Sequence, residues 1–354
     1  MAELIGPVRS LDLNLVLFLG AGFSKPFGLP TMTGFFDHAL GDGSPLDGQE
    51  RSLITDLRRQ VRKTTSMLDA DEGNLEDLLS VCLFSDEGWP GAVSPALLRC
   101  LWKVYRSLDP GICEPLFESA LKKLVGFDQI DSHHHTVITT NYDVVAEYGF
   151  WRIRRPLGLP CEWQPTADAK KEHLLHDPMG STRVICKLHG SINWFLGQGG
   201  DSADLLQVDG RIKHDVELSP EGRASLSVPH VSHKKCPSPE RAPLIVPPTL
   251  YKGFYPACFN PIWKAARDAL RKADRLVFVG YSFPPSDTHL KYFLACSLAE
   301  NVSFKSIDIL DLEASQICDR LRLPSAGFGS AFRQKLRAFD GRWEENSQYN
   351  ILER

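Results

Sequence analysis

A five-residue apolar run, Leu15–Leu19, stops at Gly20-Ala21-Gly22-Phe23-Ser24, and helix-compatible sequence follows. A run of this length suits one buried strand, and glycines let the backbone turn sharply and approach a ligand closely. The free N–H groups at a helix start can then bind an anion. Gly28, the third glycine, comes six residues after Gly22, so the spacing departs from G-x-G-x-x-G. The segment predicts a phosphate cradle in an α/β protein, with a plain strand-to-helix turn as the competing interpretation.

Short apolar runs bounded by turn residues predict buried strands of a parallel sheet. Five such runs are present: Leu15–Leu19, Thr136–Thr140, Arg183–Leu188, Arg275–Val279 and Phe304–Leu310. Four of them end in a polar or glycine-rich segment, and the fifth ends at Asp311. Because ligands bind beyond the carboxyl ends of the strands in an open α/β sheet, all five ends could contribute to one site.

Two long insertions separate these strands. Residues 41–130 carry apolar residues at i, i+3 and i+4, which predicts a helical subdomain; the expected helices are Gln49–Leu68, Asn74–Leu83, Pro95–Ser107 and Glu114–Leu124. Residues 196–240 are rich in Gly, Asp, Ser, His and Lys, which predicts loops and short hairpins. A helix over Ala331–Phe339 is expected in the C-terminal tail.

The composition is that of an ordinary globular protein: 354 residues, 43% hydrophobic, 24% charged, net charge −4. This balance disfavours nucleic acid as the main ligand. The nine cysteines form no C-x-x-C pair and the N-terminus has no apolar targeting core, so reduced thiols and a cytoplasmic location are expected. Apolar runs of about nine residues are too short to span a bilayer.

Polar side chains follow the second predicted strand, in Thr140-Asn141-Tyr142-Asp143. An amide and a carboxylate two residues apart at a strand end can both face one crevice, where they suit a carboxamide or a ribose. The competing interpretation is that Asn141 or Asp143 caps the helix that follows.

The third predicted strand runs into Lys187-Leu188-His189-Gly190-Ser191. Gly190 permits a turn that would expose the imidazole, and a histidine can take a proton from a ribose hydroxyl or from water at neutral pH. A structural histidine is the alternative for His189.

The fourth segment, Gly280–Asp287, places Gly280 and Ser282 at a strand end as further phosphate or ribose contacts, unless the segment is a proline-stiffened loop followed by a helix cap. Leu244–Thr249 is expected to be structural. The histidines match no metal-site spacing, and a G-x-x-x-x-G-K-[ST] segment is absent, so neither a metal nor an ATP-hydrolysing loop is predicted.

Taken in order, GAGFS, TTNYD, KLHGS and GYSFPPSD resemble the sirtuin-type NAD-binding domain. More closely they resemble its prokaryotic branch of NAD-consuming effectors, often associated with defence against phage. The resemblance covers about residues 13–40, 134–195 and 243–315. It implies an open Rossmann-like parallel sheet, formed by residues 1–40, 131–195 and 241–325, with insertions at 41–130 and 196–240 and a tail at 326–354.

The resemblance also implies roles for individual residues. His189 would be the catalytic base, Asn141 would position the nicotinamide ribose, and Asp143 would face the carboxamide. Asp311 would handle the adenine ribose. The other predicted NAD+ contacts are Gly20, Ala21, Gly22, Phe23, Ser24, Thr140, Gly280 and Ser282.

The chain departs from deacylating sirtuins in three places. After the His-Gly pair it has only Cys236 in place of a four-cysteine zinc module, so no zinc is expected. It has Thr31-Met32-Thr33 in place of Asp-Phe-Arg, and Thr140 in place of a glutamine. These departures favour an NAD+ glycohydrolase over a protein deacylase; a non-catalytic module that senses NAD or ADP-ribose is the other alternative. The resemblance further implies homo-oligomers and, in some systems, a HerA-type ATPase partner.

Overall fold

The structure is a computed structural model. It describes residues 13–64, 74–77, 79–80, 95–105, 116–125, 135–152, 184–196, 259–284, 287–301 and 304–346, with shorter stretches at 206–208, 212–213, 216–218, 224–226, 230–231, 243, 245–246 and 349.

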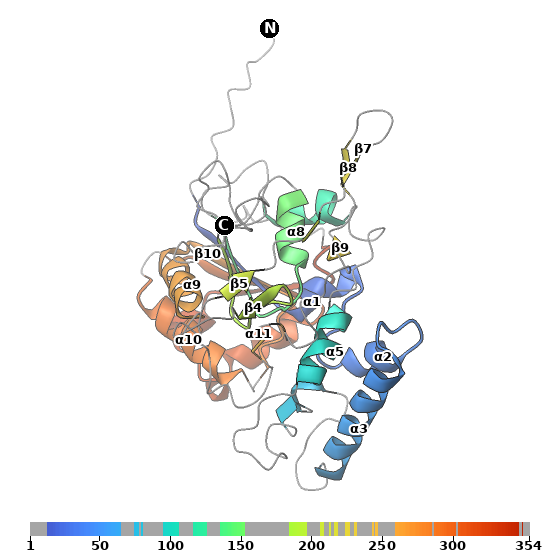
Figure 1. The fold of residues 1–354 in the computed structure, drawn as a ribbon. Coiled ribbons are helices and arrows are strands. Elements are labelled where there is room, and N and C mark those ends of the chain that lie inside the picture. Colours follow the sequence, from blue (N-terminus) through green and yellow to red (C-terminus); the bar gives the residue numbers. More distant parts are fainter. Residues whose placement is uncertain are drawn as a thin grey trace, which may run out of the picture.

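Six parallel strands form the central sheet (Figure 1), in the order β12-β11-β10-β1-β2-β3. The strands are β1 (Leu15–Leu19), β2 (His135–Thr139), β3 (Val184–Lys187), β10 (Arg275–Val279), β11 (Ser306–Asp311) and β12 (Leu336–Asp340). The chain builds outward from β1 to β3, returns to the other side of β1, and builds outward again to β12. This is the strand order of a Rossmann sheet, and the direction reverses between β1 and β10, where ligands bind in such sheets. The fold class predicted from the sequence is confirmed, and the five expected strands lie within two residues of their predicted bounds.

Successive residues of each strand point to opposite faces of the sheet. All five residues of β1 are apolar and buried, so both faces of the sheet are covered by helices. Val16 and Phe18 of β1 belong to one core, which α9 (Asn260–Lys272), α10 (Thr288–Ala299) and α11 (Ala314–Arg322) cover. Leu15, Leu17 and Leu19 belong to the opposite core. That core is completed by α1 (Ala21–Ser24), η1 (Lys25–Phe27), the π-helical turn η2 (Phe117–Leu121), α7 (Lys122–Leu124) and α8 (Val145–Arg152).

The helical insertion has a third core of its own (Figure 1). The core contains α3 (Gly48–Thr64), α5 (Pro95–Tyr105) and helical residues 75–77 and 79–80 of the insertion, together with α2 (Phe35–Leu40), which precedes it in the chain. The helices within the insertion agree with three of the expected helices, and the fourth, Glu114–Leu124, is observed as η2 and α7 in the opposite core; residues 65–68, 78, 81–83, 106–107 and 114–115 lie outside the described part of the chain. Tyr142 and Ile192 also belong to this core. The insertion therefore packs directly on the loops that follow β2 and β3.

The described segments of the second insertion form short antiparallel ladders. These pair β4 (Trp194–Leu196) with β5 (Leu206–Val208), β6 (Ile212–Lys213) with β9 (His230–Val231), and β7 (Val216–Leu218) with β8 (Ala224–Leu226). Hairpins were the expectation for this region. The division of the chain into domains stays a proposal.

The expected C-terminal helix over Ala331–Phe339 is wrong. The helix α12 (Ser330–Arg333) is a single turn, and Leu336–Asp340 forms the edge strand β12 beside β11. The reason is a buried ion pair: Arg337 donates two hydrogen bonds of 2.7 Å to the carboxylate of Asp308, which is fully buried in β11. Arg275 of β10 lies 3.9 Å from the same carboxylate. This network secures the edge strand to the rest of the sheet.

Replacing Asp308 tests this network. In Asp308→Ala the buried Arg275 loses its counter-charge, so we expect the free energy of unfolding, measured by urea titration, to fall by about 3–5 kcal/mol. Asp319→Ala is the matched control, because Asp319 pairs with Arg322 on the exposed surface, where such pairs contribute about 0–1 kcal/mol. Equal losses in the two variants would show that Asp308 has no special role.

Candidate functional site

The two glycine segments contact each other through their backbones at the carboxyl ends of β1 and β10. Gly22 donates to the carbonyl of Gly280 (2.9 Å), and Gly280 donates to the carbonyl of Leu310 (2.9 Å). A Cβ atom on Gly280 would lie 2.3 Å from the backbone of Gly22 and Phe23, and Gly280 has a φ of +61°. A Cβ atom on Gly22 would lie 2.7 Å from Gly280 Cα. Only glycine fits at either position.

The loop after β2 binds to the first glycine segment. The Asn141 side-chain amide donates to Gly20 O (2.8 Å) and to Ser24 Oγ (3.0 Å), and Thr140 beside it is half-buried. In the described part of the chain no hydrogen bond reaches the Asn141 side-chain oxygen. The predicted convergence of the GAGFS and TTNYD segments is therefore present, with Asn141 held in one orientation.

Asp143 is 4% exposed and its carboxylate serves the start of α8. Its Oδ1 accepts the backbone N–H of Val145 (2.9 Å). Burial raises the pKa of Asp143, while the charge of Lys187 and hydrogen bonds from Val145 and Ser24 oppose that rise. The helix-capping interpretation thus describes the observed contact, and a contact with a carboxamide stays a prediction.

Lys187, at the end of β3, is a functional candidate that the sequence analysis did not single out. Its side chain is completely buried, and its ammonium group donates to the backbone carbonyl of Asp143 and to Glu147 Oε1 (2.9 Å). Burial raises the pKa of Glu147, and the Lys187 charge opposes this rise. A charged residue closing an otherwise apolar strand was the available signal, because such a residue needs a buried partner. Lys187 ties the loop after β3 to the loop after β2.

The loop after β3 packs on the loop after β2. Leu188 donates to Thr139 O (2.9 Å), and Ile192 donates to Tyr142 O (2.9 Å). His189 is only 5% exposed, so the expected exposure of its imidazole is wrong. Residues 245–246 cover this loop: Val246 donates to His189 O (2.8 Å), and Ile245 pairs with Gly190.

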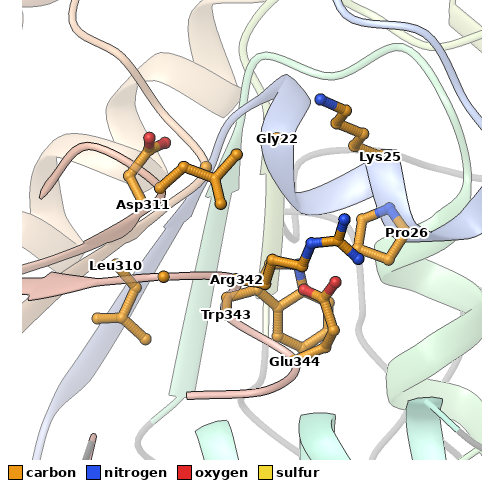
Figure 2. A pocket seen from close by; sticks show the side chains of 11 residues that line it. Gly22, Lys25, Pro26, Leu310, Asp311, Arg342, Trp343 and Glu344 are labelled. Atoms are coloured by element: carbon orange, nitrogen blue, oxygen red, sulfur yellow. The ribbon is translucent and has the colours of Figure 1, made fainter.

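A cavity of about 340 Å³ opens beside the glycine segments (Figure 2). Of the predicted contacts, Gly22, Gly280 and Asp311 line it; Asn141 and His189 do not. Burial raises the pKa of Asp311. Ser282 is exposed, and its carbonyl accepts a hydrogen bond from Arg320. Phe23 faces the core and stacks on Trp343 with ring centroids 4.9 Å apart.

Charged and aromatic side chains that the sequence does not predict as contacts also line the cavity, among them Lys25, Arg342, Trp343 and Glu344. The last three follow β12, in the segment expected to be a helical tail. Among the described residues, no group of three or more His, Cys, Asp or Glu side chains is placed to hold a metal ion. None of the described helices is long and apolar enough to cross a membrane.

One family model matches part of the chain. Residues 135–306 match the family model of the SIR2-like domain. The matched range contains the TTNYD, KLHGS and GYSFPPSD segments and begins after GAGFS. The predicted resemblance to the sirtuin-like family is confirmed, and the assignment to its anti-phage branch stays a prediction. No match was found among curated proteins.

Solved structures of Sir2 proteins are similar over most of their length. One, described for the mechanism and regulation of Sir2 enzymes, is 15% identical, with 94% of this chain and 88% of that chain covered and a TM-score of 0.39. Another, Sir2Tm bound to a propionylated peptide, is 17% identical, with 96% and 92% covered and a TM-score of 0.35.

The contact between the glycine segments can be tested by adding one methyl group. In Gly280→Ala the new Cβ collides with backbone, and a positive φ strains an alanine further, so we expect the free energy of unfolding to fall by about 3 kcal/mol or more. Gly48→Ala is the control, because no atom lies within 4 Å of a Cβ at that position. A Gly280→Ala protein as stable as the control in thermal or urea unfolding would contradict the observed contact.

The buried lysine gives a second prediction. Lys187→Met leaves the Glu147 carboxylate buried without its cation, which should lower the free energy of unfolding by about 3–5 kcal/mol at neutral pH. The loss should shrink as the pH falls, because a buried carboxyl with a raised pKa becomes neutral on protonation. The double variant Lys187→Met/Glu147→Gln should recover much of the loss. A double variant no more stable than Lys187→Met would show that the pair is not the cause.

Proposed function

We propose that this protein, whose residues 135–306 match the SIR2-like domain model, is an NAD+ glycohydrolase that releases nicotinamide and ADP-ribose. One observation carries the proposal: segments far apart in the chain meet at the carboxyl edge of the sheet and are joined by hydrogen bonds. Asn141 is bound to the Gly20–Ser24 segment, and that segment is bound to Gly280. This edge is where an open α/β sheet binds a dinucleotide.

The carboxyl edge of the sheet has two sides, one on each side of the switch point, and each would hold one half of NAD+: the ADP half or the nicotinamide ribose. On one side of the switch point, the cavity at Gly22, Gly280 and Asp311 would hold the ADP half. On the other side, beyond β2 and β3, Asn141 and His189 would face the nicotinamide ribose. Gly20, Ala21, Ser24, Thr140 and Ser282 would line the path between the halves, whereas the observed burial of Phe23 favours a packing role.

Cleavage breaks the bond between the ribose C1′ atom and the nicotinamide nitrogen, and the bond electrons leave with nicotinamide. Positive charge develops on the ribose, as in glycoside hydrolysis. A water molecule then bonds to C1′ and gives its proton to His189. The free side-chain oxygen of Asn141 would orient the ribose or the water. The fixed orientation of Asn141 supports this role because small errors in position cost much of the rate.

The activity would be regulated. An enzyme that destroys NAD+ requires control, and the helical insertion packs on Tyr142 beside Asn141. We propose a regulated effector of anti-phage defence that acts in the cytoplasm as a homo-oligomer, with a HerA-type ATPase as a candidate partner.

Nicotinamide release from NAD+, followed by chromatography, tests the activity. Loss of a positioned acid–base group typically lowers the rate by about 10² to 10⁴; we therefore expect His189→Ala and Asn141→Ala each to lose NAD+ cleavage while staying folded. His289→Ala is the control, because His289 lies exposed on α10. A folded His189→Ala protein with wild-type turnover would remove His189 from the mechanism.

The same assay separates the alternatives. Release that requires an acyl-lysine peptide would identify an NAD-dependent protein deacylase. Binding of NAD+ without release of nicotinamide, with and without candidate partners, would identify a sensing module.

A further inference from the structure

The turn after β12 reaches the cavity at the carboxyl edge of the sheet. Its position is fixed at both sides: Gly341 donates to Asp311 O (3.0 Å), and the buried Trp343 stacks on Phe23. Arg342 lies between these two fixed residues. The sheet and the core therefore hold the Arg342 backbone at the rim of the cavity.

Two cationic side chains project at this rim. Figure 2 shows Lys25 and the Arg342 guanidinium on the same side of the view as Pro26, with Asp311 on the opposite side. Both cations are exposed. Arg342 comes no closer than 3.7 Å to Glu345, which is too far for a hydrogen bond. No ion pair to Lys25 is found in the described part of the chain. Neither charge is therefore committed to a strong internal partner.

Two carboxyl groups line the cavity as well. Asp311 and Glu344 are half-buried carboxyls whose pKa values burial raises, and such groups accept hydrogen bonds from hydroxyls. Guanidinium and ammonium groups instead bind phosphate oxygens. A cavity of about 340 Å³ lies at the lower end of the range for small-molecule sites, about 300–1,000 Å³.

We infer that Arg342 and Lys25 bind the phosphates of a nucleoside diphosphate group, so that the C-terminal turn forms part of the nucleotide site. The inference rests on the proposed function in one respect: the diphosphate would be that of NAD+ and of its product, ADP-ribose. It adds that the enzyme recognises its substrate by the charge of the diphosphate, through two side chains outside the glycine segments.

Calorimetric titration with ADP and with adenosine tests the inference. Arg342→Met and Lys25→Met should each weaken ADP binding about tenfold and leave adenosine binding within about twofold, since only ADP carries the phosphates. Arg342→Lys should retain part of the affinity because it keeps the charge. Lys272→Met is the control: Lys272 is exposed at the end of α9, next to the amino end of β10.

Three results would overturn the inference: wild-type protein that does not bind ADP, variants that bind ADP as tightly as wild type, or variants that lose ADP and adenosine equally. The proposed function fails separately. Wild-type protein that binds ADP through Arg342 and Lys25 but releases no nicotinamide overturns the hydrolase alone. If Arg342→Met and Lys25→Met both release nicotinamide with the wild-type KM for NAD+, the phosphate contacts alone are overturned.

Discussion

Direct backbone contact between the Gly22 and Gly280 turns fixes the geometry of the whole carboxyl edge. Two loops that come from strands on either side of the switch point share a hydrogen bond where neither has room for a side chain. Because the turns are this close, Asn141 can reach the first of them from the loop after β2, and Leu310 of β11 accepts a hydrogen bond from the second. The cavity at this edge exists because backbone, not side chains, fills the space between β1 and β10.

Burial of charge holds the rest of the edge in place. Lys187 lies under the loops after β2 and β3, and Asp308 joins the edge strand β12 to the sheet. Each of these charges is enclosed by apolar core and needs its partner, since an unpaired buried charge costs several kcal/mol. Two buried ion pairs therefore position opposite ends of the candidate site. The Lys187 pair holds the loop of His189 on one side, and the Asp308 pair holds the strand that leads to Arg342 on the other.

The sequence was sufficient for the features that depend on local composition and insufficient for those that depend on distant partners. Continuous apolar runs located five strands, and the polar residues after them located the edge. The strand β12 was not predicted because Arg337 and Asp340 interrupt the apolar residues of Leu336–Asp340, and the partner of Arg337, Asp308, lies 29 residues earlier. The burial of His189 was not predicted because it too depends on a distant part of the chain. Ile245 and Val246, which contact the backbone of Gly190 and His189, come from a separate segment whose register no local pattern sets.

Tyr142 links the helical insertion to the candidate catalytic residues. Its ring packs against Tyr105 of α5 with centroids 5.9 Å apart, and its hydroxyl donates to Val246 O (2.9 Å). Its own carbonyl accepts the N–H of Ile192 in the loop of His189. Asn141 and Asp143 flank it in the chain. Since close-packed cores transmit small displacements rather than absorb them, a shift of α5 would move Tyr142 and with it Asn141. The insertion is thus part of the structure that sets the geometry of Asn141, which is the property a regulatory subdomain needs.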